Sequence, residues 1–178
     1  MAIHFVLGGA KSGKTNFAEQ KVQTLANQSK KQVVYLATAT AEDHEMSDKI
    51  QRHRAERPKE WQTIEEPILL AETLANIDHE NHCIMVDCLT LWLNNLLGLE
   101  NSSTRKQQVE ALFDYLNLVK DNPQVEIVFV SNEVGQGIIP LGELTRQFVT
   151  ESGVLHQNIA KIATEVEFIT VGLPMRLK

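Results

Sequence analysis

A phosphate-binding motif stands near the start of the chain. Residues 8–15 read G-G-A-K-S-G-K-T, which matches G-x-x-x-x-G-K-T, and they directly follow the apolar run 3–7. Glycines adopt backbone angles closed to other residues, so successive N–H groups can converge on phosphate oxygens at the positive end of the next helix. Lys14 would bring a positive charge to the outer phosphates, and the Thr15 hydroxyl a ligand for Mg²⁺. The motif predicts a nucleoside triphosphate site made of Gly8, Gly9, Ala10, Lys11, Ser12, Gly13, Lys14 and Thr15.

A single carboxylate ends a second apolar run. Asp87 follows residues 83–86, the position at which P-loop NTPases place the carboxylate that holds Mg²⁺ or one of its waters. The alternative role is an N-terminal cap for a helix that starts near Leu89, and one side chain can serve both purposes. We expect Thr15 and Asp87 to hold the metal.

The segment 43–58 is rich in histidine and arginine. If it is helical, Met46, Ile50, His53 and Arg57 lie at i, i+4, i+7 and i+11, within about 60° of one another. From spacing alone, a structural role is the more common outcome for one histidine on an apolar stripe. However, a cation is costly in a closed core, so Arg57 on the same stripe favours a solvated cleft that receives anions.

The same segment also suggests chemistry at phosphorus. Positive charge from Arg52, Arg54 and Arg57 would lower the pKa of His53, and a neutral imidazole is a competent nucleophile. Guanidinium groups can hold the non-bridging oxygens as charge develops. The alternative is that these arginines form only a solvated face.

Two other segments could contact a substrate. Asn132 and Glu133 follow the apolar run 125–130 and could orient substrate or water, or they could simply belong to a strand exit. Glu65 and Glu66 could accept hydrogen bonds from a ribose or base, although surface carboxylates are common.

Strand-length apolar runs alternate with helical patterns along the chain. Strands are predicted at residues 3–7, 33–37, 83–86, 125–130 and 168–171, and helices at residues 14–28, 44–56, 68–76, 89–97, 104–120 and 143–164. This alternation predicts an α/β fold with a mostly parallel sheet covered on both faces. Ligands of such sheets lie beyond the carboxyl ends of the strands, which selects residues 8–15, 38–40, 87 and 131–137.

Composition limits the classes of partner. The 178 residues carry 17 basic and 23 acidic side chains, a formal net charge of −6, so we expect no nucleic-acid partner. We expect one domain over 1–178, no membrane insertion and a cytoplasmic location, because no membrane-length apolar run or signal peptide is present. Cys83 and Cys88 lie too far apart on one predicted strand to bridge each other, and we expect reduced core residues.

The motifs together resemble one family, the bifunctional adenosylcobinamide kinase and adenosylcobinamide-phosphate guanylyltransferase of cobalamin biosynthesis. The resemblance runs almost end to end and rests on four segments: G-G-A-K-S-G-K-T at 8–15, Y-L-A-T-A at 35–39, D-H-E-M through I-Q-R-H-R-A-E-R-P to Trp61, and S-N-E-V-G-Q-G-I-I-P at 131–140. It implies a RecA-like P-loop NTPase fold and a homotrimer. It also implies ATP and GTP as substrates with Mg²⁺, and adenosylcobinamide and its phosphate as acceptors.

The resemblance also implies residue roles. The family's guanylylated histidine matches His53, which replaces the structural role favoured by spacing. Positions used for guanine nucleotide match Thr38, Ala39, Thr40, Arg54, Ala55, Glu56, Arg57 and Glu65. Asp87 stands where some relatives carry Glu, and Arg52 where some carry a second histidine. Because guanylyl transfer needs His53 close to the α-phosphorus of GTP, we expect the segment that bears His53 to move towards the P-loop when GTP binds.

Two other functions are compatible with the motifs. The first is a single-activity P-loop kinase for a small metabolite, in which His53 only binds phosphate. The second is a GTP-dependent switch module, which is disfavoured because no N-K-x-D motif for guanine selectivity appears in the sequence.

Overall fold

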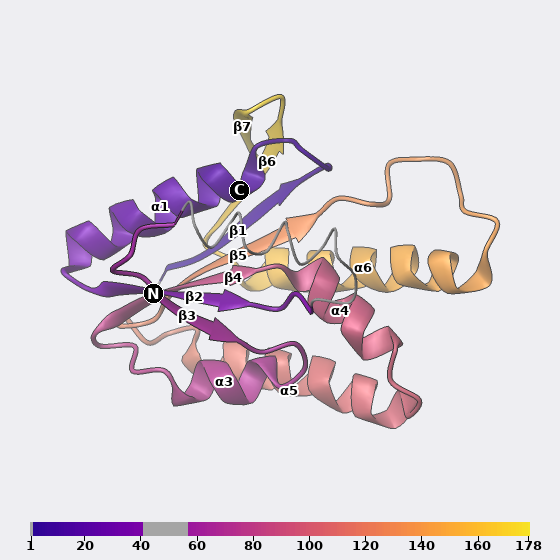
Figure 1. The fold of residues 1–178 in the computed structure, drawn as a ribbon, viewed down its shortest axis with the longest axis horizontal. Helices are drawn as coiled ribbons and strands as arrows, with labels where there is room; N and C mark the ends of the chain where they lie inside the picture. Colours follow the sequence, from indigo (N-terminus) through magenta and orange to yellow (C-terminus); the bar gives the residue numbers. More distant parts are fainter. Residues whose placement is uncertain (1, 41–56) are drawn as a thin grey trace.

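Seven strands form one sheet in the computed structural model, which describes residues 2–40 and 57–178. The strand order is β3-β2-β4-β5-β1-β6-β7 (Figure 1). The strands are β1 (Ala2–Gly8), β2 (Gln32–Ala37), β3 (Gln62–Glu65), β4 (His82–Asp87), β5 (Glu126–Asn132), β6 (Glu165–Thr170) and β7 (Leu173–Arg176). All neighbouring pairs are parallel except β6 and β7. The carboxyl ends of six strands therefore meet along one edge, called here the rim.

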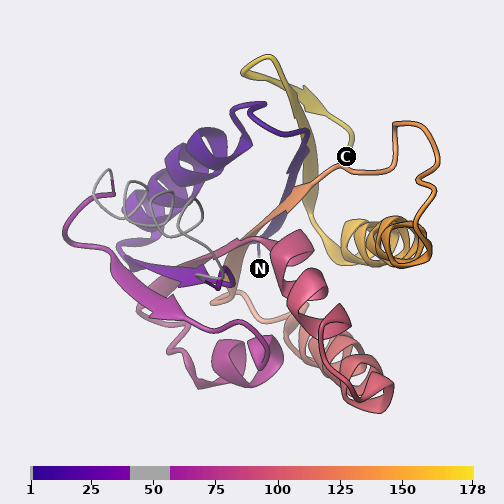
Figure 2. The same cartoon turned by 45° about the vertical axis from the view of Figure 1, so that its right-hand side comes forward.

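Helices cover both faces of this sheet. They are α1 (Lys14–Ser29), α3 (Leu70–Asn76), α4 (Leu89–Leu97), α5 (Ser102–Val119) and α6 (Glu143–Ile162). Figure 2 shows α1 on one face and the other helices on the opposite face. Each face has its own buried cluster, because Val22 of α1 packs with Val6, whereas Leu93 of α4 and Ile159 of α6 pack with Phe5.

Alternation along β1 explains how one strand serves both clusters. Ile3, Phe5 and Leu7 belong to the cluster beneath α4, α5 and α6, whereas Val6 belongs to the cluster beneath α1. Successive side chains of a strand point to opposite faces, so a central parallel strand must be apolar on both. This requirement produces the continuous apolar runs from which the strands were predicted.

The predicted α/β class is confirmed, and most predicted elements match. β6 begins at Glu165, three residues before the predicted start, because Glu165 and Glu167 interrupt its apolar pattern. The short strands β3 and β7 were not predicted, since β3 is only partly buried and all of β7 is exposed. The predicted helix at 44–56 lies outside the described residues.

Both cysteines are buried and free. Cys83 lies in β4, whereas Cys88 lies just beyond that strand, at the N-cap of α4. Burial raises the pKa of the Cys83 thiol to about 12 and that of Cys88 to about 11, so both stay protonated at neutral pH. Both cysteines are core residues as predicted, but the prediction that they share one strand is wrong, because the strand ends at Asp87. Within residues 2–40 and 57–178, no helix has the length and apolar character needed to span a membrane.

Candidate active site

The phosphate-binding loop connects β1 to α1 at the rim. Gly13 is the N-cap of α1 with φ of 92°, and Lys11 also has a positive φ, 56°. Lys14 is 9% exposed, and its Nζ donates to the carbonyl of Gly9 at 3.2 Å. The ammonium group thus lies across the loop, beside the first N–H groups of α1, where a phosphate would be received.

Two glycines of the loop are favoured for different reasons, Gly8 by close contacts and Gly13 mainly by its positive φ. A Cβ at Gly8 would lie 2.4 Å from Ser12 Oγ and 2.7 Å from the Ile169 carbonyl oxygen. A Cβ at Gly13 would lie 3.2 Å from Cα of Gly172, in the turn between β6 and β7. The Gly172 N–H donates to the Ser12 carbonyl at 2.8 Å, so this hairpin braces the loop from outside.

The buried hydroxyl of Ser12 indicates that the loop binds a ligand. Its hydroxyl oxygen is buried and has no hydrogen-bond partner among the described residues. A buried hydroxyl without a partner is costly, and a bound phosphate oxygen would accept its proton. Ala10 and Lys11 are exposed at the tip of the loop, and Thr15 is half-buried in the first turn of α1.

Asp87 ends β4 on the same rim and is held by a tyrosine. The Tyr35 hydroxyl donates to Asp87 Oδ2 at 2.6 Å. Burial, followed by the negative charge of Asp87, raises the pKa of Tyr35 well above its ordinary value, so the hydroxyl remains a donor. The guanidinium carbon of Arg57 lies 3.3 Å from the centroid of the Tyr35 ring, in a cation–π contact. Arg57 and Asp87 are therefore joined through one aromatic side chain.

The predicted segment 38–40 is fastened to the end of β4. The Thr38 hydroxyl donates to the Cys88 carbonyl and accepts from the Cys88 N–H, each at 2.8 Å. The Thr38 side chain is buried, and both hydrogen bonds of its hydroxyl are made with the main chain of Cys88. Ala39 and Thr40 are half-buried beyond it and continue along the rim.

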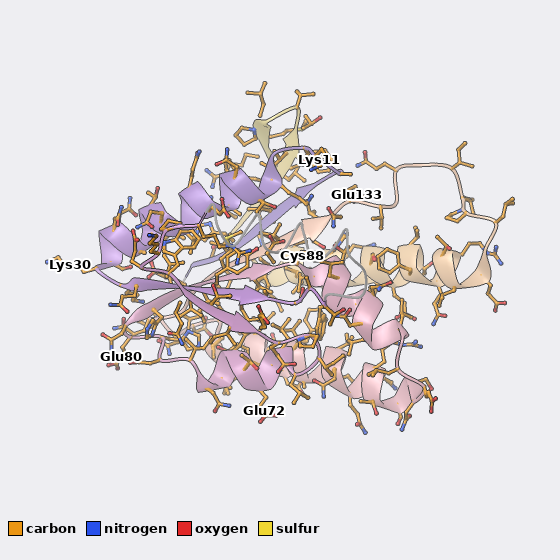
Figure 3. The ribbon with its side chains drawn as sticks, in the orientation of Figure 1. Lys11, Lys30, Glu72, Glu80, Cys88 and Glu133 are labelled. Carbon is orange, nitrogen blue, oxygen red and sulfur yellow. The ribbon has the colours of Figure 1, made fainter. Side chains whose placement is uncertain are left out.

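The end of β5 lies beside the loop. Asn132 pairs with Gly8 in the sheet register, and the Glu133 N–H donates to the Gly8 carbonyl at 3.0 Å. The Asn132 amide donates to the Thr90 hydroxyl at 2.9 Å, which links β5 to the first turn of α4. In Figure 3, Glu133, Lys11 and Cys88 lie on the same side of the molecule, whereas Lys30 and Glu80 lie at the opposite end.

The two glutamates after β3 have different surroundings. Glu65 is exposed at the carboxyl end of β3 and pairs with Ala37 in the register. Glu66 accepts hydrogen bonds from the N–H groups of Ile68 and Leu69 at 2.8 and 2.7 Å, so it shapes the chain before α3. Glu66 is therefore engaged by the main chain that follows it, whereas Glu65 lies exposed at the rim end of β3.

Other predicted site residues fall outside the described part of the chain. His53, Arg54, Ala55 and Glu56 belong to this group, so their roles stay predictions. Arg57 is the first described residue after them, and its contact with Tyr35 places the end of that segment at the rim.

The oxygen ligands at the rim suit Mg²⁺. This ion prefers oxygen donors and usually takes one or two protein ligands together with phosphate oxygens and waters. A hydroxyl at Thr15 and a carboxylate at Asp87 are such donors. Among the described residues no group of three or more His, Cys, Asp or Glu side chains could form a complete protein cage. The residues therefore fit a metal that arrives with the nucleotide.

Sequence reasoning missed two features of the site. The role of Tyr35 was not recognised, although Y-L-A-T-A was singled out and the residue stands two positions before the end of a predicted strand. A buried pair formed by Ser131 and His156, with 2.7 Å between Oγ and Nε2, was also missed because 25 residues separate its members. Burial lowers the pKa of His156, so its imidazole is neutral and packs against Phe5.

A family model described as cobinamide kinase / cobinamide phosphate guanyltransferase matches residues 4–177. The chain belongs to this family. Its members are named for two reactions, so the predicted bifunctional transferase is confirmed at the level of the family.

Two named relatives match nearly the whole chain. The bifunctional adenosylcobalamin biosynthesis protein CobP of Pseudomonas aeruginosa is 47% identical over 173 residues, which are 97% of this chain and 95% of that protein. The corresponding protein CobU of Escherichia coli is 31% identical over 182 residues, 97% and 98% of the two chains. The resemblance inferred from the four motifs is thereby confirmed.

Solved structures confirm the predicted fold. The flagellar accessory protein FlaH of Methanocaldococcus jannaschii superposes with a TM-score of 0.57 over 99% of this chain and 78% of its own, at 12% identity. A second solved structure, an ATPase domain, has a TM-score of 0.53 over 94% of this chain and 68% of its own, at 15% identity. At these identities the likeness concerns the RecA-like P-loop fold alone.

Proposed function

We propose that this chain carries out two consecutive transfers on one acceptor. The first phosphorylates the aminopropanol hydroxyl of adenosylcobinamide with ATP or GTP. The second transfers GMP from GTP to that phosphate and yields adenosylcobinamide-GDP. Membership of the family supports both reactions, and a biosynthetic role of this kind agrees with a cytoplasmic location.

The kinase step uses the loop between β1 and α1. Its N–H groups and Lys14 hold the β- and γ-phosphates, while Thr15 and Asp87 would hold Mg²⁺, which neutralises phosphate charge when bound. The acceptor oxygen forms a bond to the γ-phosphorus, the bond to the β,γ-bridging oxygen breaks, and the acceptor hydroxyl loses its proton. Lys14 is already oriented across the loop towards Gly9, so little rearrangement precedes phosphate binding.

The transferase step uses His53 as the nucleophile. Its nitrogen forms a P–N bond to the α-phosphorus of GTP as the bond to pyrophosphate breaks. A phosphate oxygen of the phosphorylated acceptor then attacks the same phosphorus, and the P–N bond breaks to release the imidazole. Attack requires the nitrogen within about 3 to 3.5 Å of phosphorus, in line with the leaving group.

The contact of Arg57 with Tyr35 is the observation that best supports a single site for both steps. Arg57 lies four residues after His53, and it stacks on the side chain that holds Asp87. The end of the segment that carries the nucleophile is therefore anchored beside the carboxylate expected to serve the kinase. An arginine at this place can also pair with phosphate oxygens, which suits both reactions.

Labelling with GTP tests the proposal. The protein is incubated with Mg²⁺ and GTP labelled at the α-phosphate, and the retained label is mapped to a peptide. The substitution His53→Ala should lower covalent labelling by at least about 10³-fold while kinase activity on adenosylcobinamide persists. The substitution His44→Ala, a second histidine of the same segment, is the matched control and should label normally, whereas Lys14→Ala should impair both reactions. Labelled His53→Ala protein would refute the assignment of the nucleophile.

A further inference from the structure

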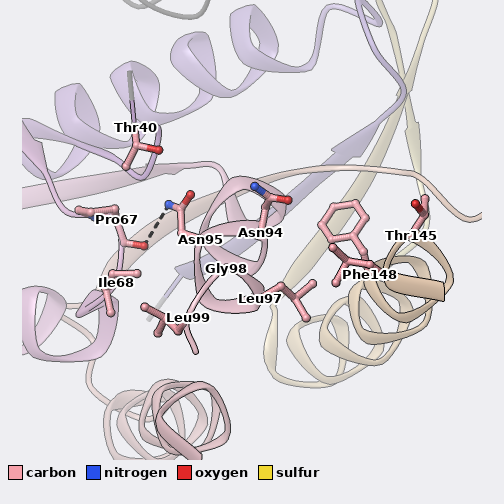
Figure 4. A pocket seen from close by; sticks show the side chains of 11 residues that line it. Thr40, Pro67, Ile68, Asn94, Asn95, Leu97, Gly98, Leu99, Thr145 and Phe148 are labelled. Carbon is pink, nitrogen blue, oxygen red and sulfur yellow. Dashed lines mark hydrogen bonds between the residues drawn. The ribbon is translucent and has the colours of Figure 1, made fainter. Parts of the chain in front are cut away.

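A cavity of about 560 Å³ opens beyond the carboxyl edge of the sheet (Figure 4). Its walls come from Thr40 after β2, Ile68 after β3, the second half of α4, and the first turns of α6. In open α/β sheets, ligands bind in crevices outside the carboxyl ends of the strands. The position of this cavity is therefore that of a ligand site, although none of its walls belongs to the P-loop.

The lining of the cavity is uncharged and mostly apolar. Ile68, Leu97 and Phe148 contribute apolar surface, and Asn94 and Thr145 contribute an amide and a hydroxyl. None of its lining residues, all of which are described, is Asp, Glu, Lys, Arg or His. Such a surface suits a large neutral ligand with methyl groups and amides, and it suits neither a triphosphate nor a purine edge that requires a carboxylate.

One asparagine links this cavity to the phosphate site. The Asn95 amide donates to the carbonyls of Thr38 at 2.8 Å and Pro67 at 3.2 Å, which fixes two walls against α4. The hydroxyl of Thr38 in turn binds the main chain of Cys88, the residue after Asp87. Hydrogen bonds thus join the cavity to the main chain of Cys88, the residue that follows the expected metal carboxylate.

We propose that this cavity binds one flank of the corrin macrocycle of the acceptor. The inference rests on the proposed function, because it assigns a place to the substrate of that reaction. A corrin ring carries methyl groups and uncharged amide arms at its edge, which match the apolar walls and the groups of Asn94 and Thr145. A cavity of this volume has room for a flank of the ring, and the remainder extends over the rim so that the aminopropanol arm reaches the phosphate loop.

Paired substitutions with matched controls test this assignment. Asn94→Leu removes an exposed amide, and Leu144→Ala truncates an exposed leucine of the cavity wall, without touching the loop. Asn117→Leu and Leu118→Ala are the controls, since both residues are exposed on α5 and lie outside the cavity. Kinase KM and kcat for adenosylcobinamide, KM for the nucleotide, and corrinoid-free labelling with GTP are measured for each variant.

We expect KM for adenosylcobinamide to rise about tenfold in the Asn94→Leu/Leu144→Ala double variant. This is the size of effect expected when binding loses one neutral hydrogen bond and one apolar contact. The nucleotide KM and the GTP labelling should stay at wild-type values, as should all parameters of the control variants. An unchanged KM for adenosylcobinamide overturns the inference, and so does a rise in nucleotide KM alone. A change in oligomeric state of the double variant would instead identify the cavity wall as a protein interface. Failure of the wild-type chain to phosphorylate adenosylcobinamide or to label would refute the proposed function itself, which separates the two outcomes.

Discussion

At the scale of single residues, Tyr35 lies between two side chains of opposite charge, Asp87 and Arg57. Its hydroxyl donates to Asp87 at 2.6 Å, and its ring receives the guanidinium of Arg57. The hydrogen bond fixes one carboxylate oxygen and leaves the other oxygen directed elsewhere. A carboxylate held in this way presents a defined oxygen to a metal that arrives with the nucleotide.

Replacing Tyr35 by Phe tests this role. The ring and its contact with Arg57 remain, but Asp87 loses its donor, so its carboxylate is less well oriented. The Mg²⁺ concentration for half-maximal kinase rate should rise by roughly 10-fold, the lower part of the range for the loss of a group that orients a metal ligand. Tyr115→Phe is the matched control, because the Tyr115 hydroxyl contacts His79 at 2.6 Å and no residue of the rim. A titration of kinase rate against Mg²⁺ that is the same for all three proteins would contradict the proposed role.

Several residues of the site could be predicted because their chemistry is local. The loop residues 8–15 follow one another, and Lys14 and Asp87 each end or begin an element that has a clear pattern. Tyr35 could not be assigned in this way, because its partners stand 52 and 22 residues away and meet only when β2 and β4 pair. The hydrogen bond between Gly172 and Ser12 could not be predicted either, because β7 carries no apolar pattern that reveals a strand.

At the scale of elements, α1, β1 and β6 meet around a buried histidine. His4 of β1 is 6% exposed, and its Nδ1 lies 3.2 Å from Glu165 of β6. Lys21 of α1 forms ion pairs with Glu165, at 2.7 Å, and with Glu167. Burial first, and then the charge of Lys21, lowers the pKa of His4 to about 4 despite the opposing charges of Glu165 and Glu126. At neutral pH the contact between His4 and Glu165 is therefore not an ion pair.

This junction predicts a loss of stability on acidification. Between pH 6.5 and about 4 the unfolded chain binds a proton at His4 and the folded chain does not, so the free energy of unfolding falls as pH falls. The loss attributable to His4 is at most about 3 kcal/mol over this window. The lowered pKa of Glu165, caused mainly by its hydrogen bond from Lys21, acts in the same direction. The contribution of His4 is therefore measured by comparing the pH dependence of the unfolding free energy between variants.

Urea unfolding at several pH values measures the effect. The substitution His4→Gln removes the titrating group and should give a shallower decline between pH 6.5 and 4. Thr24→Ala, at a neighbouring position of α1 in the same junction, removes no titrating group and should keep the wild-type slope. Equal slopes for His4→Gln and the wild type would show that the imidazole does not govern this dependence.

At the scale of elements it is also clear why the predicted start of β6 lies three residues after the observed one. Its first half carries Glu165 and Glu167, which read as loop residues in isolation. Glu165 has partners on α1 and β1, and Glu167 pairs with Lys21 of α1, so the strand tolerates both carboxylates within the sheet. An apolar pattern reveals strands that are buried on both faces, and it misses strands whose charges are neutralised by neighbours distant in sequence.

At the scale of the whole molecule, the described chain leaves two separate apolar patches exposed. One consists of Ile138, Ile139 and Leu141 in the loop before α6, and the other of Leu173, Met175 and Leu177 along and just after β7. Figure 1 shows the loop and the β6–β7 hairpin projecting separately from the body. A cyclic trimer is built from heterologous contacts, in which two different surfaces of one chain meet in neighbouring copies. Two unlike patches on one chain suit this arrangement better than a two-fold dimer, in which one patch would contact itself.

The predicted homotrimer can be tested through both patches. Light scattering of the wild-type chain should give about three times its mass of 20.0 kDa. Ile139→Lys in the loop or Met175→Lys on β7 would place a charge in the contact, and either substitution alone should yield the monomer, because each heterologous interface uses both patches. Leu118→Lys is the control, since this leucine is 82% exposed on α5 and belongs to neither patch. If only one of the two substitutions dissociates the assembly, the patches do not meet each other. A wild-type mass of one or two chains would exclude the trimer.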